Sequence, residues 1–464
     1  RNQQRKRHMR ALQITKELFL LTLKTKPWKK DRFATKSNAV LIKKALERLG
    51  SVFIKLGQML ALRPDFIPPV FCDELYSLLD NVPSFDSTLA STILKQELGD
   101  TYSKILEFQS IPVASASFAQ VHKAKLKNGD VVAVKIQRPE VYSLVQNDLA
   151  IMRFLAKLFD VLFRPTNKLS NIVEEFESWT QDELDYVLEA SNIEKFDKVA
   201  KLVGDGIRGP KVYKELSTSK ILTMEFIDGY NLTQIIGFIR NKDAKKLKQI
   251  GFNGKEATLK LIRNILETSH VHGFFHADPH PANIIYTSDG ELVFIDFGIV
   301  GSLSKKDRIL MLRYFRELLV GKADESLDSL LKLCGEPVLM NIGEVRLKYR
   351  ILIHNFMETI EAKTYLEQQI KSGPILAETV NLLQNNGVKM PVSIVRYFKS
   401  FETVEGLIFA LYPELQIKDM AKEFRRVSIV NIVDAIPAAI SEKNINNIVL
   451  SVIDSLEKNL VLND

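Results

Sequence analysis

The sequence contains very little cysteine. Its 464 residues include only two, Cys72 and Cys334, which are too few for a framework of disulfides or for a zinc site built from cysteine pairs. We therefore expect a protein of a reducing compartment that folds around a hydrophobic core. With 46% apolar and 26% charged residues, the composition is that of an ordinary globular chain and not of a disordered one.

Long apolar runs are also missing. The best late candidate, residues 427–440, is interrupted by Asn431, Asp434 and Pro437, so no segment is expected to cross a bilayer. We also expect no secretory signal, because no charged start is followed by an apolar stretch and a small-residue cleavage site. Any membrane contact is therefore expected to be peripheral.

Basic residues exceed acidic ones only slightly, and the formal net charge is +8. Part of the excess surrounds an apolar segment at residues 18–23. The basic residues before and after it are Arg1, Arg5, Lys6, Arg7, Arg10, Lys24, Lys26, Lys29, Lys30 and Arg32. This pattern is typical of a helix on an anionic membrane surface and equally of a solvated basic helix end. Nucleic acid is not an expected partner, because stacking aromatics do not alternate with the basic residues.

Hydrophobic spacing divides the chain into three parts. Helical spacing is found at 40–62 and 89–98, and Pro64, Pro68 and Pro69 break the pattern between them. Segments 115–125 and 131–137 are short and predict a hairpin, because Asn128-Gly129 separates them.

Helical spacing resumes at 141–199, and strands are predicted at 220–226 and 291–295 within otherwise helical sequence. We predict a helical extension (1–110), a small mixed lobe with a helical insert (111–228) and a large helical lobe (229–464).

The clearest chemical pattern is His-Ala-Asp-Pro-His-Pro-Ala-Asn at residues 276–283, followed by Ile-Asp-Phe-Gly at 295–298. Asp278 and Asn283 have the spacing of a protein-kinase catalytic loop, and Asp296 heads the Asp-Phe-Gly motif. Carboxylate and amide oxygens suit Mg²⁺, so Asn283 and Asp296 are predicted metal ligands. Asp278 is predicted to accept a proton from an attacking hydroxyl or to orient a water. The two histidines, His276 and His280, are interpreted as hydrogen-bonded loop residues.

Lys135 ends an alternating run that begins at Val131, as in a half-buried strand. Kinases place at this point the lysine that pairs with the α- and β-phosphates of ATP. The segment from Val113 to Val121 lies where a kinase has its glycine-rich phosphate cover, yet it has no glycine. Alanine and serine visit positive φ less readily than glycine, so the nucleotide would be held differently. The predicted contacts are Ala114, Ser115, Ala116, Ser117, Phe118, Ala119 and Val121.

A second nucleotide contact is predicted after the strand at 220–226. Met224-Glu225-Phe226 closes this strand as the hinge between two kinase lobes would. Glu225 and Phe226 are therefore predicted to offer backbone groups to an adenine.

Together with Lys55-Leu56-Gly57-Gln58 and Glu183-Leu184-Asp185, these motifs resemble the UbiB/AarF family of atypical protein-kinase-like proteins, over about residues 40–305. In that family an alanine-rich loop replaces the glycine-rich one, a Lys-x-Gly-Gln helix folds over the active site and a Glu-x-Asp motif faces it. The resemblance implies regulatory roles for Lys55, Gln58 and Asp185. It leaves two candidates, Glu183 and Glu189, for the carboxylate that pairs with the strand lysine.

One position departs from the family pattern. The family usually has glycine immediately before the metal-binding asparagine, where this chain has Ala282. A methyl group there should be tolerated unless the backbone needs positive φ.

The resemblance implies an α+β, bilobal protein-kinase-like fold with a small β-containing N-lobe, a large helical C-lobe and an added N-terminal helical extension. It implies ATP and Mg²⁺ as cofactors. It favours ATP hydrolysis over protein phosphorylation, because the Lys-x-Gly-Gln helix occupies the space of a peptide substrate.

The implied setting is peripheral, on the reducing side of a bacterial or organelle membrane. There the chain would support the biosynthesis of an isoprenoid quinone such as ubiquinone or plastoquinone, with lipid and quinone-biosynthesis proteins as partners.

Two alternatives have different chemistry. A catalytically silent scaffold would use ATP only to switch conformation within a lipid-biosynthetic complex. A small-molecule kinase similar to the aminoglycoside phosphotransferases would share the Asp278 to Asn283 spacing. The Lys-x-Gly-Gln and alanine-rich segments argue against the second alternative.

Overall fold

The computed structural model describes residues 2–25, 34–61, 67, 69–79, 84–163, 169–339, 341–358 and 375–416, with a few single positions up to 427. Pro64, Pro68, the basic residues at 26–32 and nearly all of the run 427–440 lie outside the described residues. So do Arg1 and the side chains of residues 5–7.

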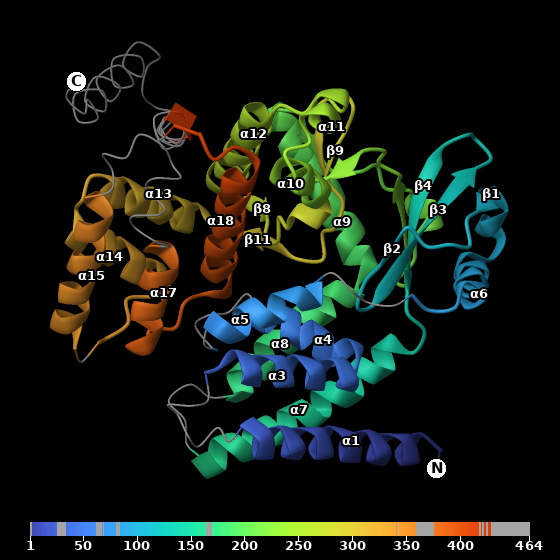
Figure 1. Cartoon of the computed structure of the whole chain (residues 1–464), viewed down its shortest axis with the longest axis horizontal. Coiled ribbons are helices and arrows are strands. Elements are labelled where there is room, and N and C mark those ends of the chain that lie inside the picture. The colour runs from blue at the N-terminus through green and yellow to red at the C-terminus, as the bar shows by residue number, and fades with distance from the viewer. Residues whose placement is uncertain are drawn as a thin grey trace. The chain divides into compact units, whose positions relative to one another are not determined.

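The chain divides into two compact units. Unit 1 contains residues 1–194, 210–227 and 296–299, and unit 2 contains residues 195–209, 228–295 and 300–464. Helix α9 (Tyr186–Val203) contributes to both (Figure 1). The predicted three-part division at residues 110 and 228 remains a prediction.

Unit 1 combines helices with one antiparallel sheet. Its helices before the sheet are α1 (Asn2–Thr25), α3 (Lys36–Leu49), α4 (Ser51–Ala61), α5 (Pro69–Leu75) and α6 (Ser87–Leu98), with 3₁₀ turns η1 (Tyr76–Leu79) and η2 (Gly99–Lys104). The helices after it are α7 (Val141–Phe163) and α8 (Leu169–Leu184). The helical spacing predicted at 40–62 is interrupted at Gly50, whose φ of 89° ends α3.

The sheet of unit 1 has the order β1 (Ile105–Phe108), β3 (Ala119–Leu126), β4 (Val131–Gln137) and β6 (Ile221–Glu225), and the short β2 (Ala114–Ser115) pairs with β3. The predicted hairpin is confirmed, because β3 and β4 are antiparallel, with Val121 opposite Lys135. Its turn needs a glycine at Gly129, where φ is 96°.

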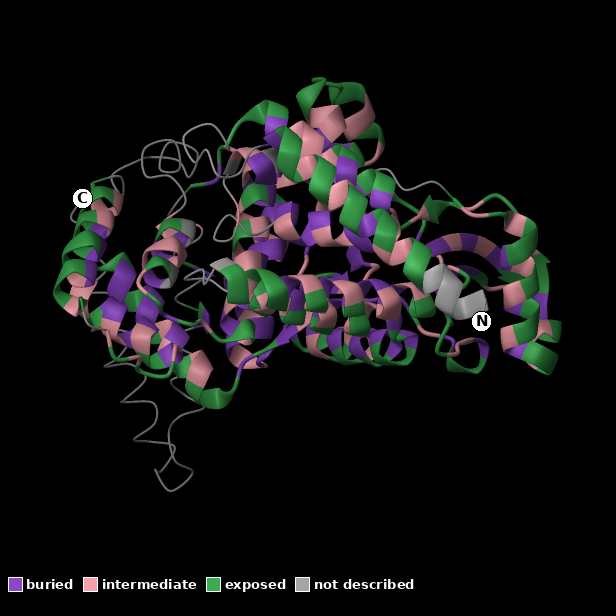
Figure 2. Ribbon diagram, turned by 90° about the horizontal axis from the view of Figure 1, so that it is seen from below, coloured by how far each residue is buried: buried purple, intermediate pink, exposed green. Residues whose placement is uncertain are grey.

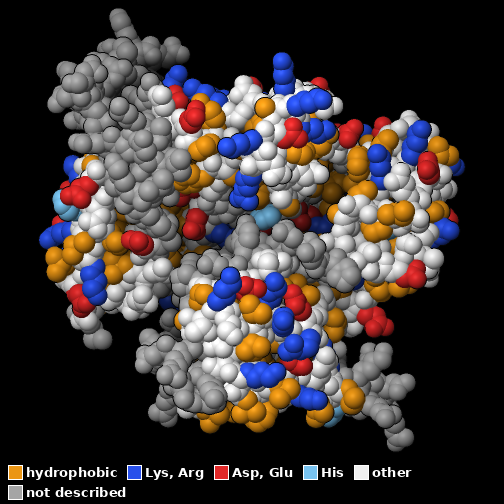
Figure 3. All heavy atoms as spheres, viewed as in Figure 1, with side chains coloured by type: hydrophobic (Ala, Val, Ile, Leu, Met, Phe, Trp, Pro, Cys, Tyr) orange, Lys and Arg blue, Asp and Glu red, His pale blue; other side chains and the backbone are white. Residues whose placement is uncertain are grey.

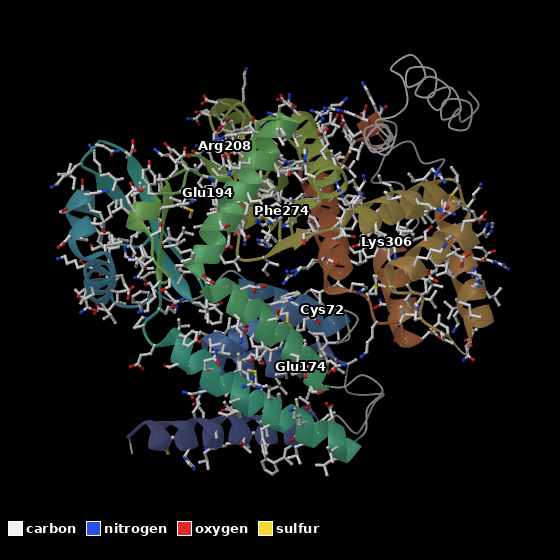
Figure 4. The ribbon with its side chains drawn as sticks, turned by 180° about the vertical axis from the view of Figure 1, so that it is seen from behind. Cys72, Glu174, Glu194, Arg208, Phe274 and Lys306 are labelled. Carbon is white, nitrogen blue, oxygen red and sulfur yellow. The ribbon has the colours of Figure 1, made fainter. Side chains whose placement is uncertain are left out.

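A hydrophobic cluster joins the helices of unit 1. It includes Leu49, Phe53 and Phe118, together with residues of α7 and α8. The helices show buried residues on one side and exposed residues on the other (Figure 2). Cys72 and Cys334 are not joined in a disulfide, and the Sγ of Cys72 on α5 lies 3.7 Å from the carbonyl oxygen of Leu60 (Figure 4).

Helix α1 is anchored by a buried charge. The guanidinium of Arg10 donates two hydrogen bonds to the carboxylate of Asp148 on α7, at 2.6 and 2.8 Å, and a third to the carbonyl oxygen of Leu49. The Asp148 side chain is fully buried. Arg10 is therefore part of the packing of unit 1, and it does not belong to the free basic patch that the sequence suggested.

Unit 2 is mainly helical, with several very short strands. Its helices are α10 (Leu232–Arg240), α11 (Ala244–Gln249), α12 (Gly254–Leu266), α13 (Lys305–Leu319), α14 (Ala323–Leu333), α15 (Ile342–Met357), α17 (Ile375–Asn385) and α18 (Val392–Leu411). One sheet has the order β5 (Ile207–Arg208), β10 (Leu292–Phe294), β9 (Ile284–Tyr286) and β7 (Tyr230–Asn231). A separate pair joins β8 (Phe274–His276) to β11 (Val300–Ser302).

These short strands place the motif residues of unit 2. Of these strands only β10 was predicted, because it lies within the longer strand-like run 291–295. The others are isolated runs of two or three residues, which carry no readable period. Arg208 on β5 forms an ion pair with Glu291 at the start of β10, with 2.9 Å between Nε and Oε2 (Figure 4). Among the described residues, no helix combines the length and the hydrophobicity needed to span a bilayer.

The glycine of the Lys-x-Gly-Gln helix allows close packing. A Cβ atom on Gly57 would lie 2.6 Å from Leu78 Cδ1 and 2.8 Å from Leu46 Cδ1. We predict that Gly57→Ala lowers the free energy of unfolding by about 1–3 kcal/mol, because the core must shift to admit the methyl group. Thermal or urea unfolding of the purified chain measures this change.

Gly406→Ala is the matched control. Gly406 is also helical, and a Cβ atom there meets no heavy atom within 4 Å. This substitution should stabilise the chain by about 0.5–1 kcal/mol through helix propensity. Equal effects of both substitutions would contradict the packing role of Gly57.

Candidate active site

Lys135 lies on β4 and is 7% exposed. Its Nζ donates hydrogen bonds to both carboxylate oxygens of Glu189, at 2.7 and 2.9 Å, and lies 3.7 Å from Oδ2 of Asp296. Glu189 is fully buried on α9 and also accepts a hydrogen bond from the backbone N–H of Phe297 at 3.3 Å. These contacts bring together a strand, a helix and the Asp-Phe-Gly segment within unit 1.

The surroundings of Lys135 keep it charged. Burial alone would lower the pKa of this ammonium, but the carboxylates of Asp296 and Glu189 outweigh it and hold the pKa of Lys135 well above its ordinary value. The centroid of the Tyr186 ring lies 5.3 Å from Nζ. Lys135 therefore presents a full positive charge at neutral pH where little water reaches it.

The structure separates the two carboxylates that the sequence left as alternatives. Glu189 holds Lys135, whereas Oε2 of Glu183 lies 2.6 Å from Nζ of Lys55. The Lys55 and Glu183 side chains are 20% and 18% exposed. Glu183 also lies against the Asp-Phe-Gly segment, because a Cβ atom on Gly298 would be 3.5 Å from its Cγ. The Lys-x-Gly-Gln helix is thus tied to residues beside that segment.

Gln58 connects the same helix to the alanine-rich loop. Its Oε1 accepts a hydrogen bond from Ser117 Oγ at 3.2 Å, and its Nε2 donates to the carbonyl oxygen of Leu78 at 2.8 Å. Both Gln58 and Ser117 are buried, and the ring of Phe118 beside them is 2% exposed. Two residues of the Lys-x-Gly-Gln motif, Lys55 and Gln58, therefore contact two predicted functional segments.

The alanine-rich loop forms without glycine because its turn does not need positive φ. Ala114 pairs with Val121, and the backbone N–H of Ala116 donates to the carbonyl oxygen of Ala119 at 2.8 Å. In the described part of the chain, the non-glycine residues with positive φ are Glu140, Lys242 and Glu336, so none lies in the loop.

The guanidinium of Arg138 holds the shape of the loop. Its Nη2 donates hydrogen bonds to the carbonyl oxygen of Ala116 at 3.0 Å and to Ser115 Oγ at 2.9 Å. The remaining predicted contacts, Ser117, Ala119 and Val121, lie on the same turn and on β3.

Asp185 acts as a helix cap. Its carboxylate accepts hydrogen bonds from the backbone N–H groups of Val187 and Leu188, both at 3.0 Å, at the start of α9. An acidic residue at a helix N-terminus satisfies unpaired N–H groups. Asp185 therefore supports the helix that carries Glu189.

The predicted adenine contacts are partly occupied by the protein itself. The backbone N–H of Glu225 donates to the carbonyl oxygen of Lys211 at 2.8 Å, and that of Phe226 donates to the carbonyl oxygen of Val131 at 3.1 Å. The Glu225 carboxylate accepts the backbone N–H of Lys211. The N–H groups that the sequence analysis offered to an adenine at these two residues are thus engaged in the sheet.

The loop that carries Asp278 belongs to unit 2. The Nδ1 of His276 accepts a hydrogen bond from the backbone N–H of Asp278 at 3.2 Å, and the Nδ1 of His280 accepts one from Ala282 at 3.3 Å. Both histidines therefore shape the loop, as predicted. Asn283 is fixed through its backbone, which donates to His280 and accepts from Ile295.

The departure at Ala282 has no structural cost. Ala282 lies in a 3₁₀ turn, η5 (Pro281–Asn283), and is not among the described residues with positive φ. The loop therefore does not need the glycine that the family pattern contains.

Sequence reasoning missed Arg138 and Tyr186, described above, and also a whole element, helix α18. Lys399 Nζ lies 3.8 Å from Asp278 Oδ1, and Ser400 Oγ donates to the carbonyl oxygen of His276 at 2.7 Å. The sequence offers no motif from which these contacts could be found. They depend on a fold that brings together residues more than one hundred positions apart.

The comparisons with known proteins place the chain in a family. The model of the ABC1 atypical kinase-like domain matches residues 77–328. An uncharacterized protein from the hydrogenase 1 5' region of Clostridium pasteurianum is 34% identical over 390 residues, which are 82% of this chain and 69% of that protein. The chloroplastic protein ACTIVITY OF BC1 COMPLEX KINASE 7 of Arabidopsis thaliana is 30% identical over 397 residues, which are 85% of this chain and 55% of that protein.

A solved structure is similar over most of its length. The structure of Rv3197 from Mycobacterium tuberculosis in complex with erythromycin shares 25% identity, with a TM-score of 0.53, and the match covers 79% of this chain and 90% of that one. The chain spans between 43% and 69% of the length of four curated relatives that it matches. These matches confirm the predicted kinase-like α+β fold and the resemblance to the UbiB/AarF proteins, and the chain belongs to the ABC1 atypical kinase-like family.

Proposed function

We propose that this chain binds ATP with Mg²⁺ and hydrolyses it slowly, in support of isoprenoid-quinone biosynthesis or lipid homeostasis at a membrane. The observation that carries the proposal is the buried pair of Lys135 and Glu189 beside Asp296, at 2.7 and 3.7 Å from the lysine Nζ. Kinases use such a pair to hold the lysine for the α- and β-phosphates. Membership of a kinase-like family supports the same chemistry.

The remaining roles follow the kinase pattern. Asp278 would accept the proton of the attacking hydroxyl or orient a water. Residues 114–121 would cover the phosphates, and the carbonyl groups of Glu225 and Phe226 remain the groups proposed for the adenine, because their N–H groups are engaged.

The proposed metal ligands suit Mg²⁺. Asp296 is 43% exposed, and its Oδ1 is oriented by the backbone N–H of Gly298 at 3.0 Å. Asn283 would add an amide oxygen. Within the described residues, no three His, Cys, Asp or Glu side chains form a metal cluster. One carboxylate plus substrate oxygens is nevertheless the usual binding mode of Mg²⁺, which would neutralise phosphate charge when bound.

The Lys-x-Gly-Gln helix is proposed to restrain the site. Lys55 holds Glu183 at 2.6 Å, and Gln58 holds Ser117 at 3.2 Å. Through these bonds α4 is attached to the Asp-Phe-Gly side and to the alanine-rich loop at once. A helix fixed in this way would leave no space for a peptide substrate, as the family resemblance implies. We therefore propose ATP hydrolysis as the reaction and not phosphorylation of a protein.

Binding of MgATP should stabilise the folded chain. A ligand that binds only the folded state raises its stability by about 2.7 kcal/mol at one hundred times its dissociation constant. We expect thermal unfolding to shift upward with MgATP in the wild type and much less in Asp296→Asn. Asp289→Asn, in an exposed turn, is the control and should respond like the wild type.

Asp278→Asn distinguishes an enzyme from a silent scaffold. Loss of a general base should lower ATP turnover by about 10²–10⁴-fold while MgATP still stabilises the variant. If the wild type is stabilised by MgATP but does not hydrolyse ATP, the result would instead favour the nucleotide-switched scaffold. No stabilisation of the wild type would reject ATP binding.

Breaking the Lys55–Glu183 pair should release the restraint. A partly exposed ion pair contributes up to about 1 kcal/mol, so Lys55→Ala should raise ATP turnover by up to about fivefold. Phosphate release measures the change. Lys44→Ala, an exposed change on α3, is the control. An unchanged rate in Lys55→Ala would remove the regulatory role of this lysine.

One face of α1 supports the membrane part of the proposal. Met9, Leu12, Phe19 and Leu23 recur at helical spacing and are 66%, 69%, 60% and 49% exposed. Lys16 lies among them, while Ile14 on the opposite face is fully buried. In Figure 3, hydrophobic and basic side chains mix at the bottom of the view, where Figure 1 places α1. Exposed apolar residues mixed with lysine are typical of helices that lie on anionic lipid.

Helix α7 adds a second exposed apolar strip within unit 1. Phe154, Leu158 and Val161 recur at the same spacing and are 68%, 45% and 71% exposed. Helices α1 and α7 are also in contact with each other. Two adjacent helices therefore expose large apolar side chains, which favours a peripheral lipid surface as the partner.

Negative charge placed on the α1 face should weaken lipid binding. We expect the double variant Leu12→Glu, Phe19→Glu to bind vesicles of phosphatidylglycerol and phosphatidylcholine at least about tenfold more weakly than the wild type, since apolar burial and attraction to anionic lipid are both lost. Vesicle flotation measures the affinity. Leu347→Glu, Ile351→Glu on α15 makes the same change elsewhere and should leave binding unaltered. Equal binding by all three proteins would exclude this face.

A further inference from the structure

Three residues on one face of helix α18 contact the Asp278 loop or the strand β11 beside it. Lys399 and Ser400 follow Arg396 by three and four positions, so both lie on the side of the helix that carries Arg396. Arg396 Nη1 donates to the carbonyl oxygen of Val300 at 3.0 Å, and Ser400 Oγ donates to that of His276 at 2.7 Å. These two bonds fix α18 against β11 and against His276 at the end of β8, where the loop begins.

The residue of this face whose charge lies next to Asp278 is Lys399. Its Nζ lies 3.8 Å from Oδ1 of Asp278, and its side chain is only 9% exposed, against 29% for the aspartate. A buried lysine is rare unless an acidic partner compensates it, because losing water costs its charge several kcal/mol. Burial raises the pKa of Glu402, one turn further along α18, and the charge of Lys399 opposes this effect. Lys399 therefore interacts with two carboxyl groups, of which Asp278 is the one in the loop.

The loop itself supplies no cation near Asp278. Residues 276–283 contain two histidines but neither lysine nor arginine, and both histidines accept backbone hydrogen bonds. Lys399 thus brings a positive charge to the predicted base from outside the motif. Helix α18 also lies beyond residues 77–328, the part that the family model matches.

We propose that Lys399 is a positioning residue for the reaction, which orients the Asp278 carboxylate and keeps it in the proton-accepting form. This inference rests on the proposed function, since it assigns Lys399 to the reaction in which Asp278 is the base. Lys399 acts through Asp278, so it should influence the rate of the chemical step more than the affinity for ATP. The role extends the functional part of the chain from the motif region to its late helices.

The first test is the steady-state kinetics of ATP hydrolysis by the full chain. We expect Lys399→Met to lower kcat by about tenfold to a hundredfold, a part of the effect of losing the base itself, while KM for ATP changes less than about threefold. Lys399→Arg keeps the charge and should recover most of kcat. Lys389→Met removes an exposed lysine just before α18 and is the matched control.

A double substitution tests whether Lys399 acts through Asp278. If it does, Lys399→Met should have no further effect on kcat in the Asp278→Asn background. Full kcat in Lys399→Met, or a loss in Lys399→Arg equal to that in Lys399→Met, would overturn the proposal. The proposal would also be overturned if the fold-loss of kcat in the double variant equalled the product of the fold-losses in Lys399→Met and in Asp278→Asn. Circular dichroism and thermal unfolding of each variant separate these outcomes from misfolding, and Lys399→Gln replaces Lys399→Met if the latter does not fold.

Failure of the proposed function gives a different result. If the wild type binds MgATP without hydrolysing it, the ATPase proposal fails and the kinetic arm has no signal. In that case the unfolding temperatures of four proteins, namely the wild type, Lys399→Met, Asp278→Asn and the double variant, test whether the two side chains interact. Non-additive shifts would retain the Lys399–Asp278 pair as a feature of the loop, and additive shifts would overturn it.

Discussion

The buried ion pair of Lys135 and Glu189 is the interaction on which unit 1 depends. Two charges removed from water are tolerated only when they are close together and when their remaining hydrogen-bonding capacity is used. Here both carboxylate oxygens of Glu189 accept hydrogen bonds from the Lys135 ammonium, and one of them also accepts a hydrogen bond from the backbone N–H of Phe297. Removing Lys135 would leave the buried Glu189 carboxylate without its cation, which costs about 3–5 kcal/mol in such positions. The pair therefore fixes β4, α9 and the Asp-Phe-Gly segment in one arrangement.

The Lys-x-Gly-Gln motif has a physical reason at three of its positions. Lys55 forms an ion pair with Glu183, Gly57 leaves room for two leucine side chains, and Gln58 accepts a hydrogen bond from Ser117. The residue between Lys55 and Gly57 contributes to the hydrophobic cluster of unit 1. The motif thus packs against the hydrophobic core and also makes polar contacts with Glu183 and with the alanine-rich loop. Both roles are needed to explain which residues it contains.

Local sequence rules predicted the elements that have a long period or a distinctive turn. The β3–β4 hairpin followed from Asn128-Gly129, and the helices from 141 to 199 followed from apolar spacing. The same rules failed at Gly50, where positive φ divides a continuous periodic segment, and at β8, β9 and β11, which have three residues each. The kinase-like family was predictable because its motif residues occur in a fixed order. The choice of Glu189 over Glu183 was not, since the two lie only six positions apart, at the end of α8 and in the first turn of α9, and only tertiary contacts distinguish them. Lys399 had no signal at all, because its partner is distant in the chain.

The anchoring of α1 affects how shortened forms of this protein should be made. Asp148 is fully buried, and its charge is compensated by Arg10. An expression boundary placed after residue 10 would remove that guanidinium and leave a carboxylate inside the packed helices of unit 1. Such a fragment would still contain every motif of the kinase-like domain, yet it would begin with a destabilised core. For soluble, well-folded material, the first boundary should therefore precede Arg10, even though the sequence before residue 40 contains none of the family motifs.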